Sequence, residues 1–328
     1  MYIEKKRIGK NVYNYLKVSI RANDKVATKT IAYLGKEPMT KKQINAKIKE
    51  ISGSSIEKIK RDTMEKLKES ADINNEFLKE KQIEMLDQMK KEFGKKQKMP
   101  DKKMLSDMFR DFKTFYIYNT NSIEGNTLTL EETNLLLNEN KTPQSKDLKE
   151  IYDHLNERET FDFIIQEKPK IDKESIIKMH SMLLKNIDER IGRFRLHEVR
   201  VFGASFDTSP SKFVDADMSI LVKWHNKNKS MLHPLVLAAI FHEKFERIHP
   251  FYDGNGRTGR MLSNMILIQN GFPPLIVENK RRKEYYDVLS VAHKAELAGI
   301  DIKLHKPIVA FFYDELLLAY EKIFSKWG

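Results

Sequence analysis

The sequence of 328 residues contains no cysteine, which excludes disulfides and thiolate metal sites. It also lacks any uninterrupted apolar run close to the ~18 residues of a membrane-spanning helix. The N-terminal residues Met1 to Arg7 are mostly charged, and no apolar stretch of the signal-peptide type follows them. We therefore expect a cytoplasmic protein with no membrane partner.

Acidic residues are scarce in the N-terminal third compared with basic ones. Residues 1–100 carry 25 Lys and Arg against 14 Asp and Glu, whereas the remaining residues carry 34 against 33. Nearly all of the net charge of +12 thus belongs to this third. Such an excess is typical of segments that bind nucleic acid or another acidic surface, although solubility alone explains many of them.

The first 36 residues are predicted to form a basic, β-rich module. Val12, Leu16, Val18 and Ile20 alternate onto one face, and the tyrosines between them fall on the other. A turn is expected at residues 22–25. The pattern predicts a small antiparallel meander.

Residues 37–100 are predicted to form a helical arm and a linker. Apolar residues recur three and four apart, as at Ile44, Ile48 and Ile51, and again at Ile83, Leu86, Met89 and Phe93. The apolar stripe is narrow and the other positions are rich in Lys and Glu, which favours an arm or a coiled pair of helices. Residues 94–100 have no apolar period and are predicted to be the linker.

The rest of the chain, 101–328, is predicted to be one mainly α-helical domain that includes the C-terminal helices. Residues 192–214 are the exception, because Val199, Val201 and Phe202 beside Gly203 indicate a short β-hairpin.

Residues 249–260 read His-Pro-Phe-Tyr-Asp-Gly-Asn-Gly-Arg-Thr-Gly-Arg and lie between two helical patterns, at 234–248 and 257–269. They are therefore expected to form a loop that leads into the N-terminus of a helix. Gly254 and Gly256 let the backbone approach a ligand closely. Successive exposed N–H groups there would form an anion-binding nest at the positive end of the helix dipole.

Four side chains around this nest suit phosphate chemistry. Arg257 and Arg260 lie three positions apart, so both can project their planar guanidinium groups from the first helical turn. Asp253 offers the kind of hard oxygen that Mg²⁺ uses beside substrate phosphates. His249 has an ordinary pKa of about 6.5 and can exchange protons near neutrality. Each residue alone has an ordinary structural explanation, but together they indicate a nucleotide-transfer site.

The stretch resembles the active-site motif of the Fic (filamentation induced by cAMP) family, His-x-Phe-x-Asp/Glu-Gly-Asn-Gly-Arg-x-x-Arg, at every specified position. Residues 191–195, 238–242 and 269–274 also resemble segments of that family. The resemblance implies a Fic-type catalytic domain over 101–328, with the hairpin as a flap. It further implies a protein adenylyltransferase that moves AMP from ATP to a protein hydroxyl and releases pyrophosphate.

By this resemblance, His249 would deprotonate the target hydroxyl, and Asp253 would hold Mg²⁺ on the phosphates of ATP. Phe251 would anchor the loop in the core. The residues that the resemblance assigns to nucleotide binding are Gly254, Asn255, Gly256, Arg257, Arg260, Asn264 and Tyr286.

A second motif, Thr120-Asn121-Ser122-Ile123-Glu124-Gly125, resembles the family's inhibitory helix. Arg260 is the residue expected to bind the γ-phosphate of ATP. A carboxylate paired with Arg260 would take the place of that phosphate, so the α-phosphate of ATP could not align for attack. Glu124 is thus the expected inhibitory residue. The simpler explanation is that it only precedes a turn and the helix that follows Thr129.

Three partners and two alternative functions stay open. The target protein would offer a Tyr, Thr or Ser hydroxyl and dock by strand addition at the flap, 196–214. Nucleic acid could bind the basic N-terminal region and make the chain a nucleic-acid-binding regulator, and a second copy could form a homodimer. Alternatively, Glu124 positions a water molecule and the enzyme removes AMP from proteins.

Overall fold

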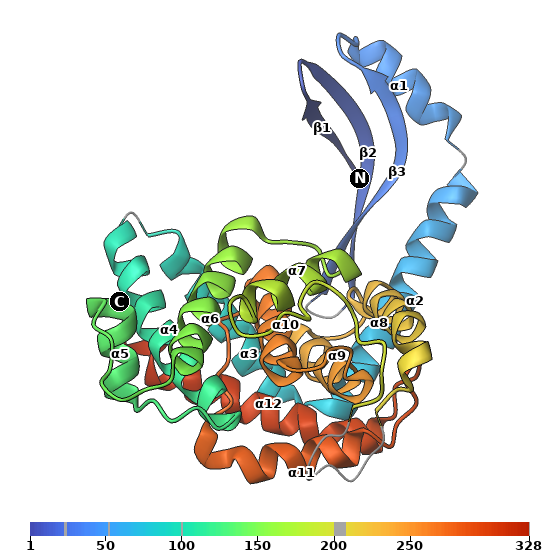
Figure 1. The fold of residues 1–328 in the computed structure, drawn as a ribbon. Coiled ribbons are helices and arrows are strands. Elements are labelled where there is room, and N and C mark those ends of the chain that lie inside the picture. The colour runs from blue at the N-terminus through green and yellow to red at the C-terminus, as the bar shows by residue number, and fades with distance from the viewer. Residues whose placement is uncertain (23–24, 52, 100, 200–207, 328) are drawn as a thin grey trace. The chain divides into compact units, whose positions relative to one another are not determined.

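The computed structural model describes residues 1–22, 25–51, 53–99, 101–199 and 208–327. These residues form two compact units, Met1–Asn75 and Glu76–Gly328. The first contains a three-stranded antiparallel sheet, and the second is helical (Figure 1). The predicted class, mainly α with a small N-terminal β meander, is confirmed.

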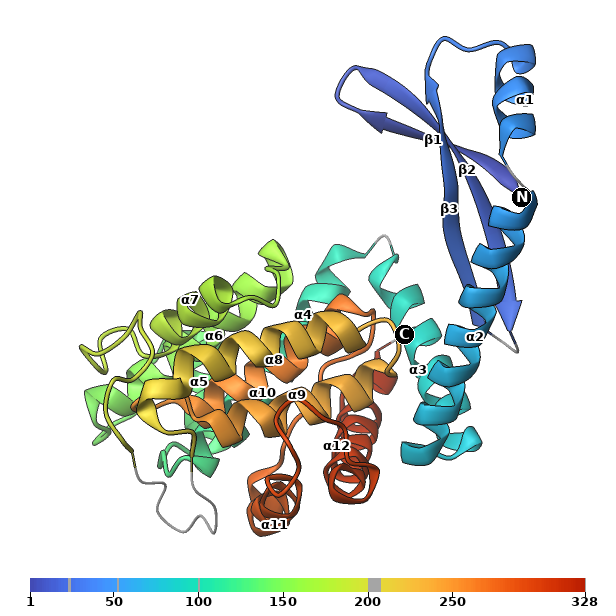
Figure 2. The same cartoon turned by 90° about the vertical axis from the view of Figure 1, so that its right-hand side faces the viewer.

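The N-terminal sheet has the strand order β1-β2-β3. The strands are β1 (Tyr2–Ile8), β2 (Asn11–Ala22) and β3 (Lys25–Lys36). Leu16 and Leu34 are buried on one face against Ile44 of helix α1 (Lys41–Glu50), which lies along this face (Figure 2). Because side chains alternate along a strand, the tyrosines fall on the opposite face, as the sequence predicts. The predicted turn at 22–25 lies partly outside the described residues.

The division between the units differs from the predicted one at residue 100. Helix α2 (Gly53–Phe77) contains the boundary, and α3 (Glu80–Gln97) belongs to the C-terminal unit. Leu86, Met89 and Phe93 are buried there, and the Phe93 ring lies 5.3 Å from that of Phe324. The expected linker at 94–100 is helical through Gln97. The apolar stripe of α3 packs into the core of the C-terminal unit and is not a coiled-coil seam.

In the C-terminal unit, α9 and α10 pack against each other, with α8 and α12 on α9 and with α4, α6 and α7 on α10 (Figure 1). α9 is apolar around most of its circumference and almost wholly buried, as expected for a central helix. The helices of this unit after α3 are α4 (Lys102–Ile123), α5 (Leu130–Glu139), α6 (Leu148–Glu167), α7 (Lys173–Leu183), α8 (Val214–Asn228), α9 (Pro234–Ile248), α10 (Asn255–Gln269), α11 (Arg282–Ala292) and α12 (Ile302–Lys322).

Two expectations concern segments without regular helices. The predicted hairpin at 192–214 lies partly outside the described residues, and its described flanks, 192–199 and 208–210, contain no strand. Ser211–Phe213 form a 3₁₀ turn. None of the helices described is long and apolar enough to cross a membrane.

Replacing Phe93 by alanine tests whether α3 is part of the C-terminal core. Loss of a fully buried phenyl ring should lower the free energy of unfolding by about 3–5 kcal/mol. Denaturant unfolding followed by tryptophan fluorescence measures this, because Trp224 and Trp327 both lie in the C-terminal unit. The exposed Lys91→Ala should change stability by less than about 0.5 kcal/mol. Equal effects of the two variants would contradict the assignment of α3.

Candidate functional site

His249 ends helix α9 and is held in a fixed orientation. Its backbone has φ 52°, and its N–H donates to the Phe245 carbonyl at 3.0 Å, so the chain turns sharply there. Its Nδ1 lies 3.3 Å from the Glu246 carbonyl. Since a carbonyl can only accept, Nδ1 carries the proton in this contact and Nε2 presents a lone pair. The ring is therefore arranged as a base.

The protonation state of His249 also suits a base. Burial lowers the pKa of His249 to about 4, although the hydrogen bond to the Glu246 carbonyl opposes the shift. The nearby Arg195 cation lowers this pKa further. The imidazole is consequently neutral at pH 7.

The side chain of Asn255 closes the loop between α9 and α10. Its Oδ1 accepts the Phe251 N–H and its Nδ2 donates to the Phe251 carbonyl, both at 2.9 Å. The Phe251 ring is fully buried and stacks on His180 with ring centroids 3.6 Å apart, which confirms its expected role as an anchor. At Gly254 (φ 71°) a Cβ would come within 2.4 Å of Leu184, so only glycine fits. Asn255 thus shapes the nest with one of its two Nδ2 hydrogens, and its expected contact with a phosphate stays a prediction.

Asp253 lies at the edge of the loop with one oxygen available. Its Oδ1 accepts the Gly254 N–H at 2.7 Å, whereas its Oδ2 faces Lys149 at 3.9 Å. The side chain is 47% exposed and borders a pocket of about 430 Å³. No group of three or more His, Cys, Asp or Glu side chains in the described part of the chain could hold a metal alone. A single free carboxylate oxygen nevertheless fits Mg²⁺, which takes most of its other ligands from phosphates and water.

Arg260 is buried in the first turns of α10 and is held by the end of α4. Its Nε donates to Thr120 Oγ1 at 2.8 Å, and its Nη2 donates to the Thr120 carbonyl at 3.0 Å. The same Nη2 forms an ion pair with Glu124 Oε1 at 2.7 Å. The predicted pair of Glu124 and Arg260 is therefore present.

The Glu124 carboxylate also covers the N-terminus of α10. A Cβ built on Gly256 would lie 2.3 Å from Glu124 Oε1, so the oxygen sits directly against the glycine backbone. The first-turn N–H groups of a helix have no partner within it and carry positive partial charge. A carboxylate is thus placed where an anionic ligand of this nest would lie.

Two other buried acids near Arg260 are protonated to a large extent at neutral pH. Burial raises the pKa of Glu246 to about 8 and that of Glu157 to about 7, although the Arg260 charge opposes both shifts. Glu157 accepts a hydrogen bond from the Tyr116 hydroxyl at 3.1 Å. Glu124 is consequently the carboxylate that neutralises Arg260 by direct contact.

Arg257 is held by a different helix from the one that holds Arg260. Its buried guanidinium forms an ion pair with Asp153 of α6, whose other oxygen accepts from the Asn126 amide at 3.2 Å. No local pattern in the sequence indicates Asp153, which lies 104 positions from its partner. The expected phosphate contact of Arg257 would have to form beside this pair.

The two remaining nucleotide-binding candidates differ in position. Asn264 is fully buried, and its amide exchanges hydrogen bonds with the Leu275 N–H and carbonyl at 2.8 and 3.0 Å. It therefore lies apart from the open side of the site. Tyr286 is 40% exposed, with the Arg282 guanidinium 5.1 Å from its ring, and its pKa is raised by burial and by the Glu124 charge. Its ring is accessible and within electrostatic range of Glu124, and stacking on a nucleoside stays a prediction.

Arg195 is a further site residue whose role the sequence did not reveal. Its buried guanidinium donates to the carbonyls of His249 at 2.7 Å and His197 at 3.1 Å, and also to that of Ser209. The Arg195 N–H donates to the Pro250 carbonyl at 2.9 Å. The Arg195 side chain therefore links the backbones of His197 and Ser209 to the backbone of His249.

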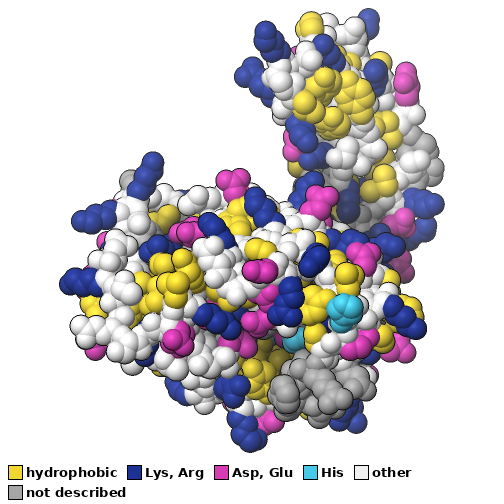
Figure 3. All heavy atoms as spheres, in the orientation of Figure 1, with side chains coloured by type: hydrophobic (Ala, Val, Ile, Leu, Met, Phe, Trp, Pro, Cys, Tyr) yellow, Lys and Arg dark blue, Asp and Glu magenta, His cyan; other side chains and the backbone are white. Residues whose placement is uncertain are grey.

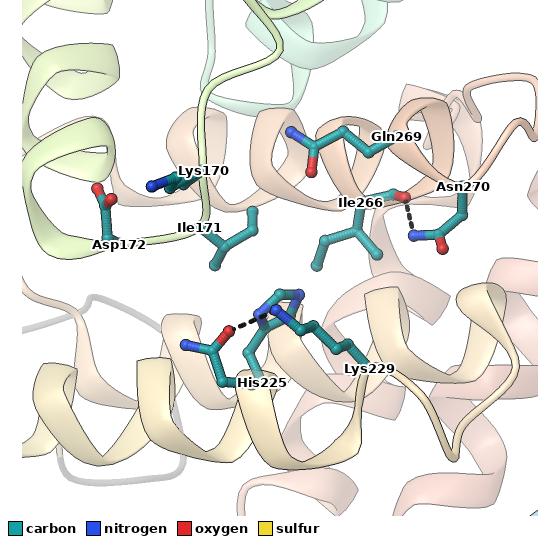
Figure 4. Close-up of a pocket in the computed structure, with 9 residues that line it drawn as sticks. Lys170, Ile171, Asp172, His225, Lys229, Ile266, Gln269 and Asn270 are labelled. Carbon is teal, nitrogen blue, oxygen red and sulfur yellow. Dashed lines mark hydrogen bonds between the residues drawn. The ribbon is translucent and has the colours of Figure 1, made fainter. Parts of the chain in front are cut away.

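A separate pocket of about 490 Å³ lies on the other end of α10, where Ile266, Gln269 and Asn270 face α8 (Figure 4). None of the motif residues lines it. The candidate site is therefore the loop between α9 and α10 with Glu124, and not this pocket.

Comparison with known proteins shows what this domain is similar to. Residues 170–267 match the family model described as Fic/DOC. The chain is 35% identical over 197 residues to protein adenylyltransferase fic-1 of Caenorhabditis elegans, covering 58% of this chain and 38% of that protein. It is 34% identical over 212 residues to protein adenylyltransferase Fic of Drosophila melanogaster, covering 61% and 39%. The chain thus spans about two fifths of the length of these relatives.

Solved structures show the same fold. A Fic-domain-containing signalling protein from Bacteroides thetaiotaomicron superimposes with a TM-score of 0.64 at 26% identity, covering 73% of this chain and 98% of that one. A fragment of Fic-1 from C. elegans gives a TM-score of 0.59 at 25% identity, covering 88% and 78%. The predicted resemblance is confirmed.

Asp153→Asn tests the importance of the pair with Arg257. It should lower the free energy of unfolding by about 3 kcal/mol, because it leaves a buried cation without its counter-charge. Asp162→Asn is the matched control on the same helix, since its pair with Lys113 is half-exposed and should contribute at most about 1 kcal/mol. Tryptophan fluorescence during denaturation compares the two. Equal stabilities would show that Arg257 needs no partner.

Proposed function

From the Fic/DOC-family domain that this chain contains, we propose that it is an autoinhibited protein adenylyltransferase that acts in the cytoplasm. One observation carries the proposal. A neutral histidine base, a half-exposed carboxylate and a helix N-terminus with a buried arginine belong to one loop and the helix that follows it, and the Glu124 carboxylate lies against that N-terminus.

The transfer step follows from this arrangement. His249 Nε2 takes the proton of a Ser, Thr or Tyr hydroxyl on the target protein. The hydroxyl oxygen then bonds to the α-phosphorus of ATP, and the bond from that phosphorus to the bridging oxygen of the β-phosphate breaks. Pyrophosphate leaves, and AMP stays on the target as a phosphodiester. The backbone N–H groups of Asn255 and Gly256, next to the Gly254 N–H that Asp253 engages, stabilise the charge that develops on the α-phosphate.

Arg260 and Asp253 are suited to the rest of the triphosphate. Arg260 is buried and keeps two hydrogen bonds to Thr120, so its guanidinium is already oriented for a γ-phosphate. Asp253 would hold Mg²⁺, which would neutralise phosphate charge. Arg257 is proposed to contact the outer phosphates from the Asp153 side.

Autoinhibition is proposed to act through both charge and space. The Glu124 carboxylate neutralises Arg260 and lies against Gly256, where a phosphate oxygen would have to lie. Bound ATP would therefore be displaced from the geometry of attack, and a misplacement of about 1 Å can slow a reaction about 100-fold.

Removal of AMP from a modified protein is the second candidate. The side chain of Glu124 is 36% exposed and hydrogen bonds to Arg260 through Oε1, which leaves Oε2 to orient a water molecule. Release of AMP from a modified target by the wild type, and not by Glu124→Gly, would favour this function.

Glu124→Gly should activate AMP transfer by about 100-fold, because it frees Arg260 and the N-terminus of α10. Intact-mass spectrometry after incubation with Mg-ATP should show an AMP-sized gain in this variant and none when His249→Ala is added. Ser122→Gly is the control, because it alters the same helix end and keeps the carboxylate. A phosphate-sized gain would instead indicate kinase-like transfer. Absence of any gain, on the protein itself and on lysate proteins, would contradict the proposal.

The activity of Glu124→Gly should persist at mildly acidic pH. The base acts only when neutral, and its lowered pKa means that it gains a proton only near pH 4. Loss of Glu124 removes a negative charge that raises this pKa, so the acid limb should not move upward. The pH dependence of kcat at saturating Mg-ATP measures this, with circular dichroism as a control for folding. An acid limb centred near the ordinary histidine value of about 6.5 would contradict it.

A further inference from the structure

The N-terminal sheet has one face that no described helix of its own unit covers. Helix α1 packs on the face of Leu16 and Leu34 (Figure 2). The opposite face presents large side chains to solvent. Tyr33 is 53% exposed there, and Tyr2 is 45% exposed.

The strand register places tyrosines and lysines on this open face in rows across the sheet. Residues that pair directly in an antiparallel sheet share a face. The first row is Lys6, Tyr13 and Lys36, the second is Glu4, Tyr15 and Tyr33, and the third is Tyr2, Lys17 and Thr30.

The tyrosine rings form one continuous aromatic surface. The Tyr33 ring lies 5.4 Å from that of Tyr15 and 6.2 Å from that of Tyr13, measured between centroids. The ring planes are tilted by 48° and 49° rather than stacked face to face. The 53% exposed ring of Tyr33 is therefore accessible to a further planar group.

The charge around this surface is positive. Lys6 and Lys36 are exposed, whereas Lys17 is paired with the single acidic residue of the rows, Glu4, at 2.7 Å. Residues 1–75 carry 18 Lys and Arg against 9 Asp and Glu. On the side of this unit seen in Figure 3, a patch coloured as hydrophobic, a class that includes tyrosine, is surrounded by Lys and Arg side chains.

We propose that this face binds single-stranded nucleic acid. Exposed aromatic rings with lysines beside them match the two parts of an unpaired strand, because bases stack on the rings and phosphates lie against the cations. In a duplex the base faces are covered by their neighbours, so the rings would have nothing to stack on. An acidic protein would use the lysines but would leave the aromatic surface unexplained. This activity is independent of nucleotide transfer at His249.

Fluorescence anisotropy on the full chain tests the proposal, with labelled oligo(dT), oligo(U) and a mixed-sequence duplex. Each should be about 20 nucleotides long, which exceeds the roughly 4–16 that such a surface covers. The protein should bind the single strands more tightly than the duplex. The affinity for the single strands should fall as the salt concentration rises. Comparing the affinities for oligo(dT) and oligo(U) shows whether the face prefers DNA or RNA.

Two double variants separate stacking from charge. Tyr15→Ala with Tyr33→Ala should weaken single-strand binding at least about tenfold, whereas Phe at both positions should retain it. Lys6→Gln with Lys36→Gln should also weaken binding and should reduce the slope of log affinity against log salt by about 1.4. Lys41→Gln with Lys42→Gln on α1 makes the same charge change away from the face and should leave binding nearly unchanged.

His249→Ala should bind like the wild type, so failure here and failure of the proposed transferase are distinguishable. Thermal unfolding of the alanine variants checks that the sheet is intact. The proposal is overturned if no single strand binds at low salt. It is equally overturned if folded Tyr15→Ala with Tyr33→Ala binds normally, or if the duplex binds as tightly as the single strands.

Discussion

A buried cation, Arg260, sets the arrangement of the candidate site. Such a charge is costly to bury unless a counter-charge and hydrogen bonds satisfy it. Thr120 and Glu124 supply both from the end of α4, while the two other acids nearby have raised pKa values and hold their protons. The Arg260 side chain therefore both links α10 to α4 and holds the Glu124 carboxylate at the site. Thr120 alone accepts two hydrogen bonds from the guanidinium, so the orientation of Arg260 does not depend on Glu124 alone.

The sequence predicted the parts of the site that lie together in the chain. The conformation of the loop from His249 to Arg260 is determined by residues within it, namely the glycines and the amide of Asn255. Asp153 and Thr120 lie 104 and 140 positions from the arginines that they hold. No local pattern indicates such partners, so only the fold reveals them. Asn264 has a structural role that the sequence does not indicate either, because its amide holds the backbone at Leu275.

The helix periods predicted most of the helices, but not which surfaces they cover. The stripe of Leu86, Met89 and Phe93 has the same spacing in a coiled arm as in a core helix. Only the aromatic contacts from Phe93 to Phe109 and Phe324 decide between them. In β2, by contrast, the alternation of side chains indicates which face carries Tyr13 and Tyr15. The two register shifts in its pairing with β3 are not evident from the sequence.

The hydrogen bonds of Arg195 have a consequence for how this site can diversify. They join His197 and Ser209, on either side of residues 200–207, to the carbonyl of the base. The two ends of that segment are thus tied to one buried guanidinium. The length and sequence between those two ends can therefore change without altering the hydrogen bonds that hold the backbone of the imidazole.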